Sequence, residues 1–116
     1  MNRAGNITAV IMAGGRSSRM GTNKGLVHFR GKEMVRWPIE ILEPLFKDVL
    51  IVANTPGYAK FGLPVYEDLL KDKGPLAGIY TALKLSATPW IFVVACDMPF
   101  VNSFVIQRLV DSCNSH

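Results

Sequence analysis

The sequence has few charged residues, few cysteines and no long hydrophobic run. Only 19% of its 116 residues carry a charge, whereas 49% are hydrophobic. This balance argues against disorder and supports a buried core. The longest apolar runs, 7–13 and 89–96, are too short to span a bilayer. We therefore expect residues 1–116 to form one compact domain that does not cross a membrane.

The cysteine content is equally low. Cys96 and Cys113 do not form a CxxC pair, and the only histidine near them is the terminal His116, so a zinc site is not expected. The first six residues lead directly into an apolar run, which argues against a secretory signal. These features favour a cytoplasmic protein whose two thiols are structural.

Positive charge is not gathered into a long block. The net charge of +4 favours anionic ligands but does not distinguish a nucleotide from a nucleic acid. Aromatic and basic residues are not interleaved as in RNA-binding sheets, so we expect no nucleic-acid partner. Part of the charge is concentrated at Arg16, Arg19 and Lys24, which predicts a local anion site.

Apolar runs alternate with segments of helical spacing. Strands are expected at 7–12, 49–53, 64–66 and 90–95, and helices at 34–46, 76–85 and from Asn102 or Ser103 through Val110. Pro44 is expected to bend or end the first of these helices. In the second helix, Tyr80 and Leu83 are expected on the buried face, and Trp90 falls at a core spacing. The alternation predicts βαβ units and a mainly parallel sheet, although four strands are few for this architecture.

A segment rich in glycine and arginine follows the first expected strand. Gly14 and Gly15 permit positive φ angles and let phosphate oxygens approach the main chain. Arg16, Arg19 and Lys24 can bind these oxygens and stabilise charge on a leaving pyrophosphate. The segment matches neither GxGxxG nor a P-loop. It predicts a triphosphate-binding loop, with an ordinary polar turn as the alternative.

Polar residues follow the other expected strands as well. Asp97 ends an apolar strand at the edge where open α/β sheets bind ligands, and its carboxylate can hold Mg²⁺. For Asp97, the alternative to metal binding is a structural role in a turn. For Asn54, the alternative to ligand binding is likewise a simple turn residue. Asp68 occupies an equivalent position after the third strand. Gly74 precedes a helix whose first N–H groups can face an anion, although small residues there also permit close packing.

Three segments, taken together, carry a family signature. They are Ala13-Gly14-Gly15-Arg16-Ser17-Ser18-Arg19-Met20-Gly21 with Lys24-Gly25-Leu26, then Gly74-Pro75-Leu76-Ala77-Gly78-Ile79, and Cys96-Asp97-Met98-Pro99-Phe100. In this order and approximate spacing they resemble molybdenum cofactor guanylyltransferases, the MobA family. The resemblance runs from about Ile7 to His116. Cytidylyl- and sugar-nucleotidyltransferases share the first segment more loosely.

The resemblance implies a fold, a reaction and a set of site residues. The fold is a Rossmann-like three-layer α/β sandwich of the nucleotide-diphospho-sugar transferase type. The reaction transfers GMP from GTP to molybdenum cofactor (molybdopterin) with Mg²⁺ and releases pyrophosphate. The implied catalytic residues are Arg16, Arg19, Lys24 and Asp97, with Asp97 also the metal ligand. The implied nucleotide-binding residues are Met12, Ala13, Gly14, Gly15, Lys24, Asn54 (or instead Val52), Asp68 as guanine reader, Gly74 and Asp97.

Members of that family are longer than this chain. Their second half supplies acceptor-binding surface, so we expect the present sequence to lack that part. An exposed sheet edge is then expected to promote self-association. Two other functions stay open: a transferase of the same fold that uses CTP or a sugar phosphate, and a nucleotide-binding module without catalysis.

Overall fold

A parallel sheet of four strands forms the centre of the protein. The computed structural model describes residues 4–13, 26–53, 57–67, 75–96 and 103–114. The strands are β1 (Ala4–Met12), β4 (Phe46–Val52), β5 (Val65–Tyr66) and β6 (Trp90–Ala95), in the order β5-β4-β1-β6. All three pairings are parallel, which confirms the sheet expected from the sequence.

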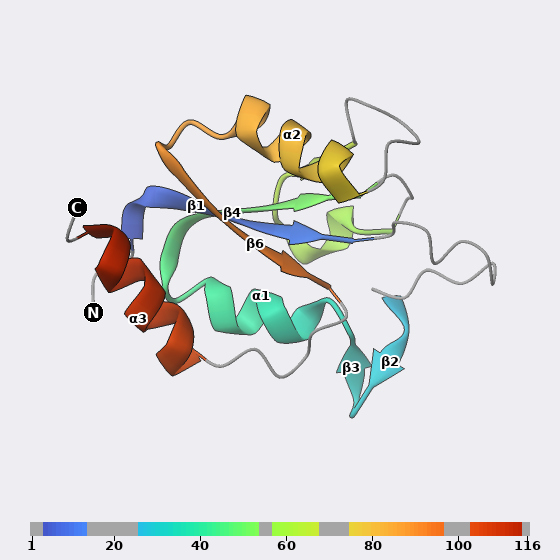
Figure 1. Cartoon of the computed structure of the whole chain (residues 1–116). Coiled ribbons are helices and arrows are strands. Elements are labelled where there is room, and N and C mark those ends of the chain that lie inside the picture. Colours follow the sequence, from blue (N-terminus) through green and yellow to red (C-terminus); the bar gives the residue numbers. More distant parts are fainter. Residues whose placement is uncertain (1–3, 14–25, 54–56, 68–74, 97–102, 115–116) are drawn as a thin grey trace.

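Helices cover both faces of this sheet. Helix α2 (Pro75–Leu85) lies on one face, and α1 (Arg36–Leu42) and α3 (Ser103–Asn114) lie on the other (Figure 1). A small antiparallel hairpin, β2 (His28–Phe29) and β3 (Lys32–Glu33), precedes α1, and a short 3-10 helix, η3 (Ala59–Phe61), precedes β5. The arrangement is the three-layer α/β sandwich that the resemblance implied.

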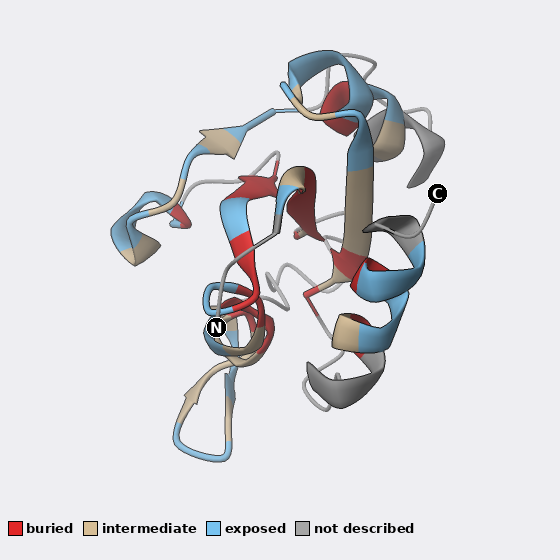
Figure 2. Cartoon of the chain, turned by 90° about the vertical axis from the view of Figure 1, so that its left-hand side faces the viewer, coloured by how far each residue is buried: buried red, intermediate tan, exposed pale blue. Residues whose placement is uncertain are grey.

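Alternation along the strands divides the core into two unequal parts. Ile7, Ala9 and Ile11 of β1 belong to the larger cluster, which also contains buried residues of α1 and α3. Val10 belongs to a smaller cluster with Ala82 of α2. Burying both faces of a strand favours the near-continuous apolar sequence seen in β1. Figure 2 shows the buried residues along the central strands and the exposed residues on the outer turns of the helices.

Two expectations about the elements were wrong. The helix expected over 34–46 ends at Leu42, and Phe46 is instead the first residue of β4, where its ring stacks on Phe92 at 5.6 Å between centroids. Pro44, which cannot continue the helical hydrogen bonding, lies between the two elements. The strand β1 also begins at Ala4, three residues earlier than expected.

The expected burial of three large residues was also wrong. Tyr80 and Leu83 of α2 are 40% and 60% exposed, and Trp90 is 44% exposed. The face of α2 that packs on the sheet instead presents Thr81 and Ala82, both fully buried. No helix within the described ranges combines the length and apolar character needed to cross a membrane.

Candidate functional site at the carboxyl edge of the sheet

Three main-chain hydrogen bonds align the carboxyl ends of the four strands. The amide of Ala13 donates to the Val52 carbonyl, that of Ala53 to the Tyr66 carbonyl, and that of Cys96 to the Met12 carbonyl, each over 2.9 Å. Each bond continues the ladder one residue beyond the end of a strand. The four strands therefore end at a common edge, where open α/β sheets bind their ligands.

Most of the predicted site residues come shortly after the strands that end at this edge. Gly14, Asn54 and Asp97 come directly after the three hydrogen-bonded residues Ala13, Ala53 and Cys96. The predicted residues that lie outside the described part of the chain are Gly14, Gly15, Arg16, Arg19, Lys24, Asn54, Asp68, Gly74 and Asp97. The structure thus describes the positions from which these segments leave the sheet.

The two predicted carboxylates follow strands that lie on opposite sides of the sheet. Asp68 follows β5 and Asp97 follows β6, and these are the two outer strands of the sheet. Three spacings of about 4.8 Å separate β5 from β6, which gives about 14 Å between their ends. The segment containing Gly14 follows β1, between the two.

Met12, Ala13 and Val52 lie within the described residues. Met12 is the last residue of β1, and its carbonyl accepts the Cys96 amide. Ala13 is buried, and its amide donates a hydrogen bond to the Val52 carbonyl. The Val52 side chain is 2% exposed and packs in the smaller core cluster. The described groups of Val52 are therefore engaged within the fold, whereas Asn54 follows the end of the ladder.

Helix α2 begins one residue after Gly74. Its first residue is Pro75, a position where the missing amide hydrogen costs nothing and the fixed φ suits the helix. The helix was expected from residue 76 to 85 and is found from Pro75 to Leu85. The first turn of a helix has N–H groups without helical partners, so its start is suited to an anionic or polar ligand.

An ion cluster links the hairpin to the elements beside it. Glu33 of β3 accepts hydrogen bonds from Lys60 of η3 at 2.8 Å and from Arg36 of α1 at 3.0 Å. The Lys60 hydrogen bond is the main cause that lowers the pKa of Glu33 to about 2, with Arg36 contributing. The Arg36 guanidinium also lies 4.8 Å from the Phe61 ring centroid. Only the short Glu33–Arg36 spacing gave any signal of this cluster in the sequence.

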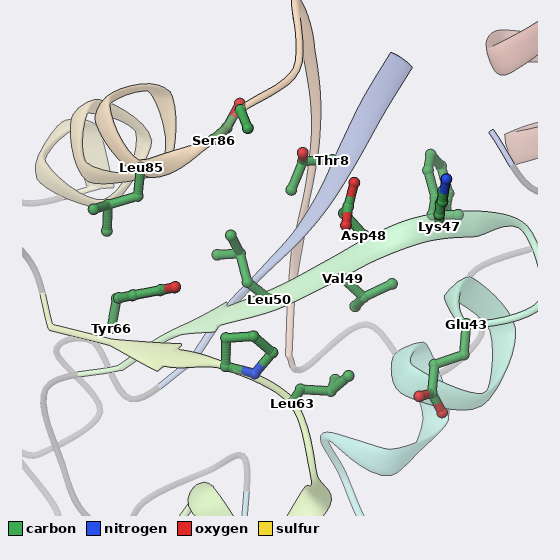
Figure 3. Close-up of a pocket in the computed structure, with 13 residues that line it drawn as sticks. Thr8, Glu43, Lys47, Asp48, Val49, Leu50, Leu63, Tyr66, Leu85 and Ser86 are labelled. Atoms are coloured by element: carbon green, nitrogen blue, oxygen red, sulfur yellow. The ribbon is translucent and has the colours of Figure 1, made fainter. Parts of the chain in front are cut away.

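A cavity of about 350 Å³ opens on the α2 side of the sheet (Figure 3). It lies between β4, β5 and the last turn of α2, and Thr8, Asp48, Leu50, Tyr66, Leu85 and Ser86 are among its lining residues. Thr8 pairs with Asp48 four residues before the Met12–Val52 pair. Tyr66, another lining residue, is the last residue of β5, and its carbonyl accepts the Ala53 amide, so the lining of the cavity reaches the carboxyl edge.

The one predicted metal ligand, Asp97, lies outside the described residues. Within the described ranges, no group of three or more histidine, cysteine, aspartate or glutamate side chains is placed to hold a metal. Asp97, the predicted ligand, directly follows Cys96, whose amide is bonded to the end of β1. A carboxylate is a ligand type that Mg²⁺ accepts, and this cation takes few protein ligands and completes its shell with other oxygens such as water.

Comparison with known proteins assigns first the class and then the family. The fold is that of nucleotidyltransferases: CMP:2-keto-3-deoxy-manno-octonic acid synthetase, solved with CTP, superposes with a TM-score of 0.81 at 16% identity, over 95% of this chain and 48% of that one. Molybdopterin-guanine dinucleotide biosynthesis protein A from Archaeoglobus fulgidus superposes at 0.69 with 27% identity, over 93% and 56%. The MobA-like NTP transferase domain model matches residues 9–116, and the chain belongs to that family.

Relatives in sequence agree with this family. A probable molybdenum cofactor guanylyltransferase of Carboxydothermus hydrogenoformans is 38% identical over 111 residues, which cover 96% of this chain and 56% of the relative. A molybdenum cofactor guanylyltransferase of Yersinia pseudotuberculosis is 42% identical over 108 residues, covering 90% and 55%. The chain thus spans about half the length of these relatives, and similarity extends over nearly all of it.

Proposed function

We propose that this chain binds GTP at the carboxyl edge of its sheet and transfers GMP to molybdenum cofactor, releasing pyrophosphate. The observation that carries the proposal is the alignment of β1, β4, β5 and β6 at one edge by the three hydrogen bonds of Ala13, Ala53 and Cys96. Each predicted polar segment follows one of these strands. The family and the names of its relatives support guanylyl transfer as the reaction.

The proposed chemistry is an in-line displacement at the α-phosphorus of GTP. An oxygen of the acceptor's terminal phosphate forms a bond to this phosphorus while the bond to the bridging oxygen of the β-phosphate breaks. Arg16, Arg19 and Lys24 offset the charge on the triphosphate and on the departing pyrophosphate. The acceptor phosphate is already a nucleophile, so alignment and charge neutralisation supply the catalysis and no protein nucleophile is needed.

Asp97 and Asp68 have different proposed roles because about 14 Å separates the strands that precede them. Asp97 would hold Mg²⁺, which screens triphosphate charge when bound. Asp68 would accept hydrogen bonds from N1–H and the N2 amino group of guanine, which adenine cannot supply. Asn54 rather than Val52 is the proposed contact from β4, because the Val52 side chain is buried.

Titration calorimetry with GTP, CTP and ATP, with and without Mg²⁺, tests the nucleotide half of this proposal. We expect GTP to bind most tightly and Mg²⁺ to increase its affinity. If CTP bound and GTP did not, the guanine assignment would be wrong and a cytidylyltransferase would be the better reading. Pyrophosphate release on addition of molybdopterin tests the transfer itself. Because the chain spans about half of its relatives, GTP binding without release would identify a nucleotide-binding module.

Three further expectations accompany this proposal. A protein that uses GTP and molybdenum cofactor belongs in the cytoplasm, and fractionation of cells tests this placement. We expect no binding to nucleic acid, which an electrophoretic shift assay checks. Among the described strands, β6 pairs with β1 alone, so its other edge is a candidate surface for self-association. Sedimentation over a range of protein concentrations measures that association.

A further inference from the structure

Four cationic side chains gather on and beside the β2–β3 hairpin, and each of them lies over an aromatic ring. The pairs are Arg30 over Phe29, Lys32 over Trp37, and Arg36 and Lys60 over Phe61. The charged groups lie between 4.1 and 5.4 Å from the ring centroids. Contact with a ring face restricts a long side chain that is otherwise flexible, so these four charges have defined positions.

The carboxylate that joins Arg36 to Lys60 is less exposed than either of them. One oxygen of Glu33 accepts a hydrogen bond from Nε of Arg36 at 3.0 Å, and the other accepts one from the Lys60 ammonium at 2.8 Å. The Glu33 side chain is 14% exposed, whereas those of Arg36 and Lys60 are 42% and 55% exposed. Among the described residues, no hydrogen bond involves the two Nη groups of Arg36. A partner would therefore meet mainly positive charge here.

The charge and the rings together indicate the kind of partner. Four cations face only two carboxylates, Glu33 and Glu40, so positive charge is in excess. The three rings are only partly exposed and already carry cations, which makes them poor platforms for stacking bases. Arginine binds carboxylates with two parallel hydrogen bonds. By charge complementarity, an acidic protein segment fits this surface better than a single-stranded nucleic acid does.

The hairpin holds one of the cations at a turn position where arginine is uncommon. Arg30 has a φ of +53° and Gly31 one of +93°, as two-residue hairpin turns of this kind require. Asparagine, aspartate or glycine usually occupies the first position, because other side chains are strained there. The hairpin extends from the body beside the start of α1 (Figure 1), and the Trp37 indole donates to the Phe29 carbonyl at 3.0 Å. An exposed charge is thus presented on an anchored hairpin.

We propose that these four cations form a docking surface, the hairpin surface, for an acidic segment of a partner protein. Carboxylates of that segment bind the Nη groups of Arg36 and the ammonium of Lys60, and the charge on Arg30 and Lys32 attracts the flanking residues. Because the ring contacts already restrict these side chains, less conformational entropy is lost on binding. None of the four residues is assigned to GTP, so the inference does not depend on the proposed function.

Fluorescence anisotropy of a labelled hexaglutamate peptide tests the hairpin surface in the full chain without nucleotide. We expect binding at low salt that weakens as salt is raised, because exposed charges are screened. Arg36→Gln/Lys60→Gln should weaken binding on the order of tenfold. The matched control, Lys84→Gln/Arg108→Gln, removes two exposed charges from α2 and α3 and should bind as the wild type does. Lys84 also lies over a ring, 6.0 Å from the centroid of Tyr80.

Arg30→Asn provides a second test if the double variant does not fold. Asparagine suits a positive φ, so this variant should melt no lower than the wild type, while the lost charge weakens peptide binding severalfold. Equal peptide affinity in the hairpin variants and in the control overturns the docking surface. A single-stranded oligonucleotide is the competing probe. If it binds through these residues and the peptide does not, the surface serves nucleic acid and the proposal fails.

Discussion

The amide of Cys96 donates to the carbonyl of Met12 over 2.9 Å, so the end of β6 is fixed beside the end of β1. The glycine-rich segment begins two residues after Met12, and Asp97 follows Cys96 directly. The predicted phosphate-binding segment and the predicted metal ligand therefore start from neighbouring strands. Parallel pairing, which aligns strand ends of the same polarity, is the cause of this proximity.

Asp97→Asn should abolish the gain in GTP affinity that Mg²⁺ produces, because a neutral amide is a much weaker ligand for a hard cation. The measurement is titration with GTP at increasing Mg²⁺. Asp48→Asn is the control: Asp48 is exposed on β4, near the opposite end of the sheet. Retention of the full Mg²⁺ effect in Asp97→Asn would assign the metal to another residue.

Arg16→Ala should weaken GTP binding by about ten- to hundredfold, since a hydrogen bond to a charged group contributes about 1.5–3 kcal/mol. Binding by the wild type should also weaken as salt is raised, and less so in the variant. Arg108→Ala is the matched control, because Arg108 is exposed on α3. Equal losses in both variants would mean that general charge, not a phosphate contact, governs affinity.

Asp68→Ala should reduce the preference for GTP over ATP on the order of tenfold, because the lost carboxylate accepts two hydrogen bonds that only guanine donates. Competition between the two nucleotides measures the ratio directly. Glu67→Gln, at the adjacent exposed position, should leave the ratio unchanged. An unaltered preference in Asp68→Ala would move base recognition elsewhere.

Glu33→Gln should flatten the acid side of the stability profile. The pKa of Glu33 is lowered from 4.5 to about 2, chiefly by Lys60, so its carboxylate stabilises the fold fully above about pH 4.5. That contribution is lost as pH falls from about 4.5 to 2, and the variant lacks it throughout. Urea unfolding at several pH values follows the change. The control is Glu40→Gln. Glu40 pairs with Lys32, and this pair is more exposed, so the variant should show the same slope of unfolding free energy against pH as the wild type.

Thr88→Val should destabilise the fold by about 1–3 kcal/mol, the usual effect of leaving a buried polar group without its partner. The Thr88 hydroxyl lies 2.7 Å from that of Thr8, which is 2% exposed, and donates to the Trp90 carbonyl at 2.7 Å. Thr8→Val removes only one of these bonds and should have the smaller effect. Urea unfolding midpoints compare the two, and the reverse order would show that the Thr8 hydroxyl matters more.

Most of the helices and strands were predictable because the pattern that indicates each one lies within a short stretch of sequence. The strand expected at 90–95 is found at those residues, since a short apolar run bounded by proline and a polar residue has few alternatives. Phe46 shows where this fails. Its apolar character suits the last turn of a helix as well as a buried strand, and its pairing with Ala4 in β1 decides between them.

The sequence predicted the common edge of the strands, whereas the site residues that follow this edge stay a prediction. Polar residues after buried strands indicate the carboxyl edge of a parallel sheet, and the structure places those strand ends together. The Glu33–Lys60 ion pair was not predictable, because it joins residues from separate elements. No periodicity or spacing encodes such a pair. Only the folded chain brings its members together.

The central place of β1 has a consequence for synthesis on the ribosome. Of the described strands of this sheet, β1 emerges before the others, whereas one of its two neighbours, β6, consists of residues 90–95 and emerges after them. Until then the β1 edge that β6 will occupy has no strand beside it, and pairings between such distant segments form slowly. We therefore expect a stage of synthesis in which this apolar edge is unpaired and contact with other chains or with chaperones competes with folding.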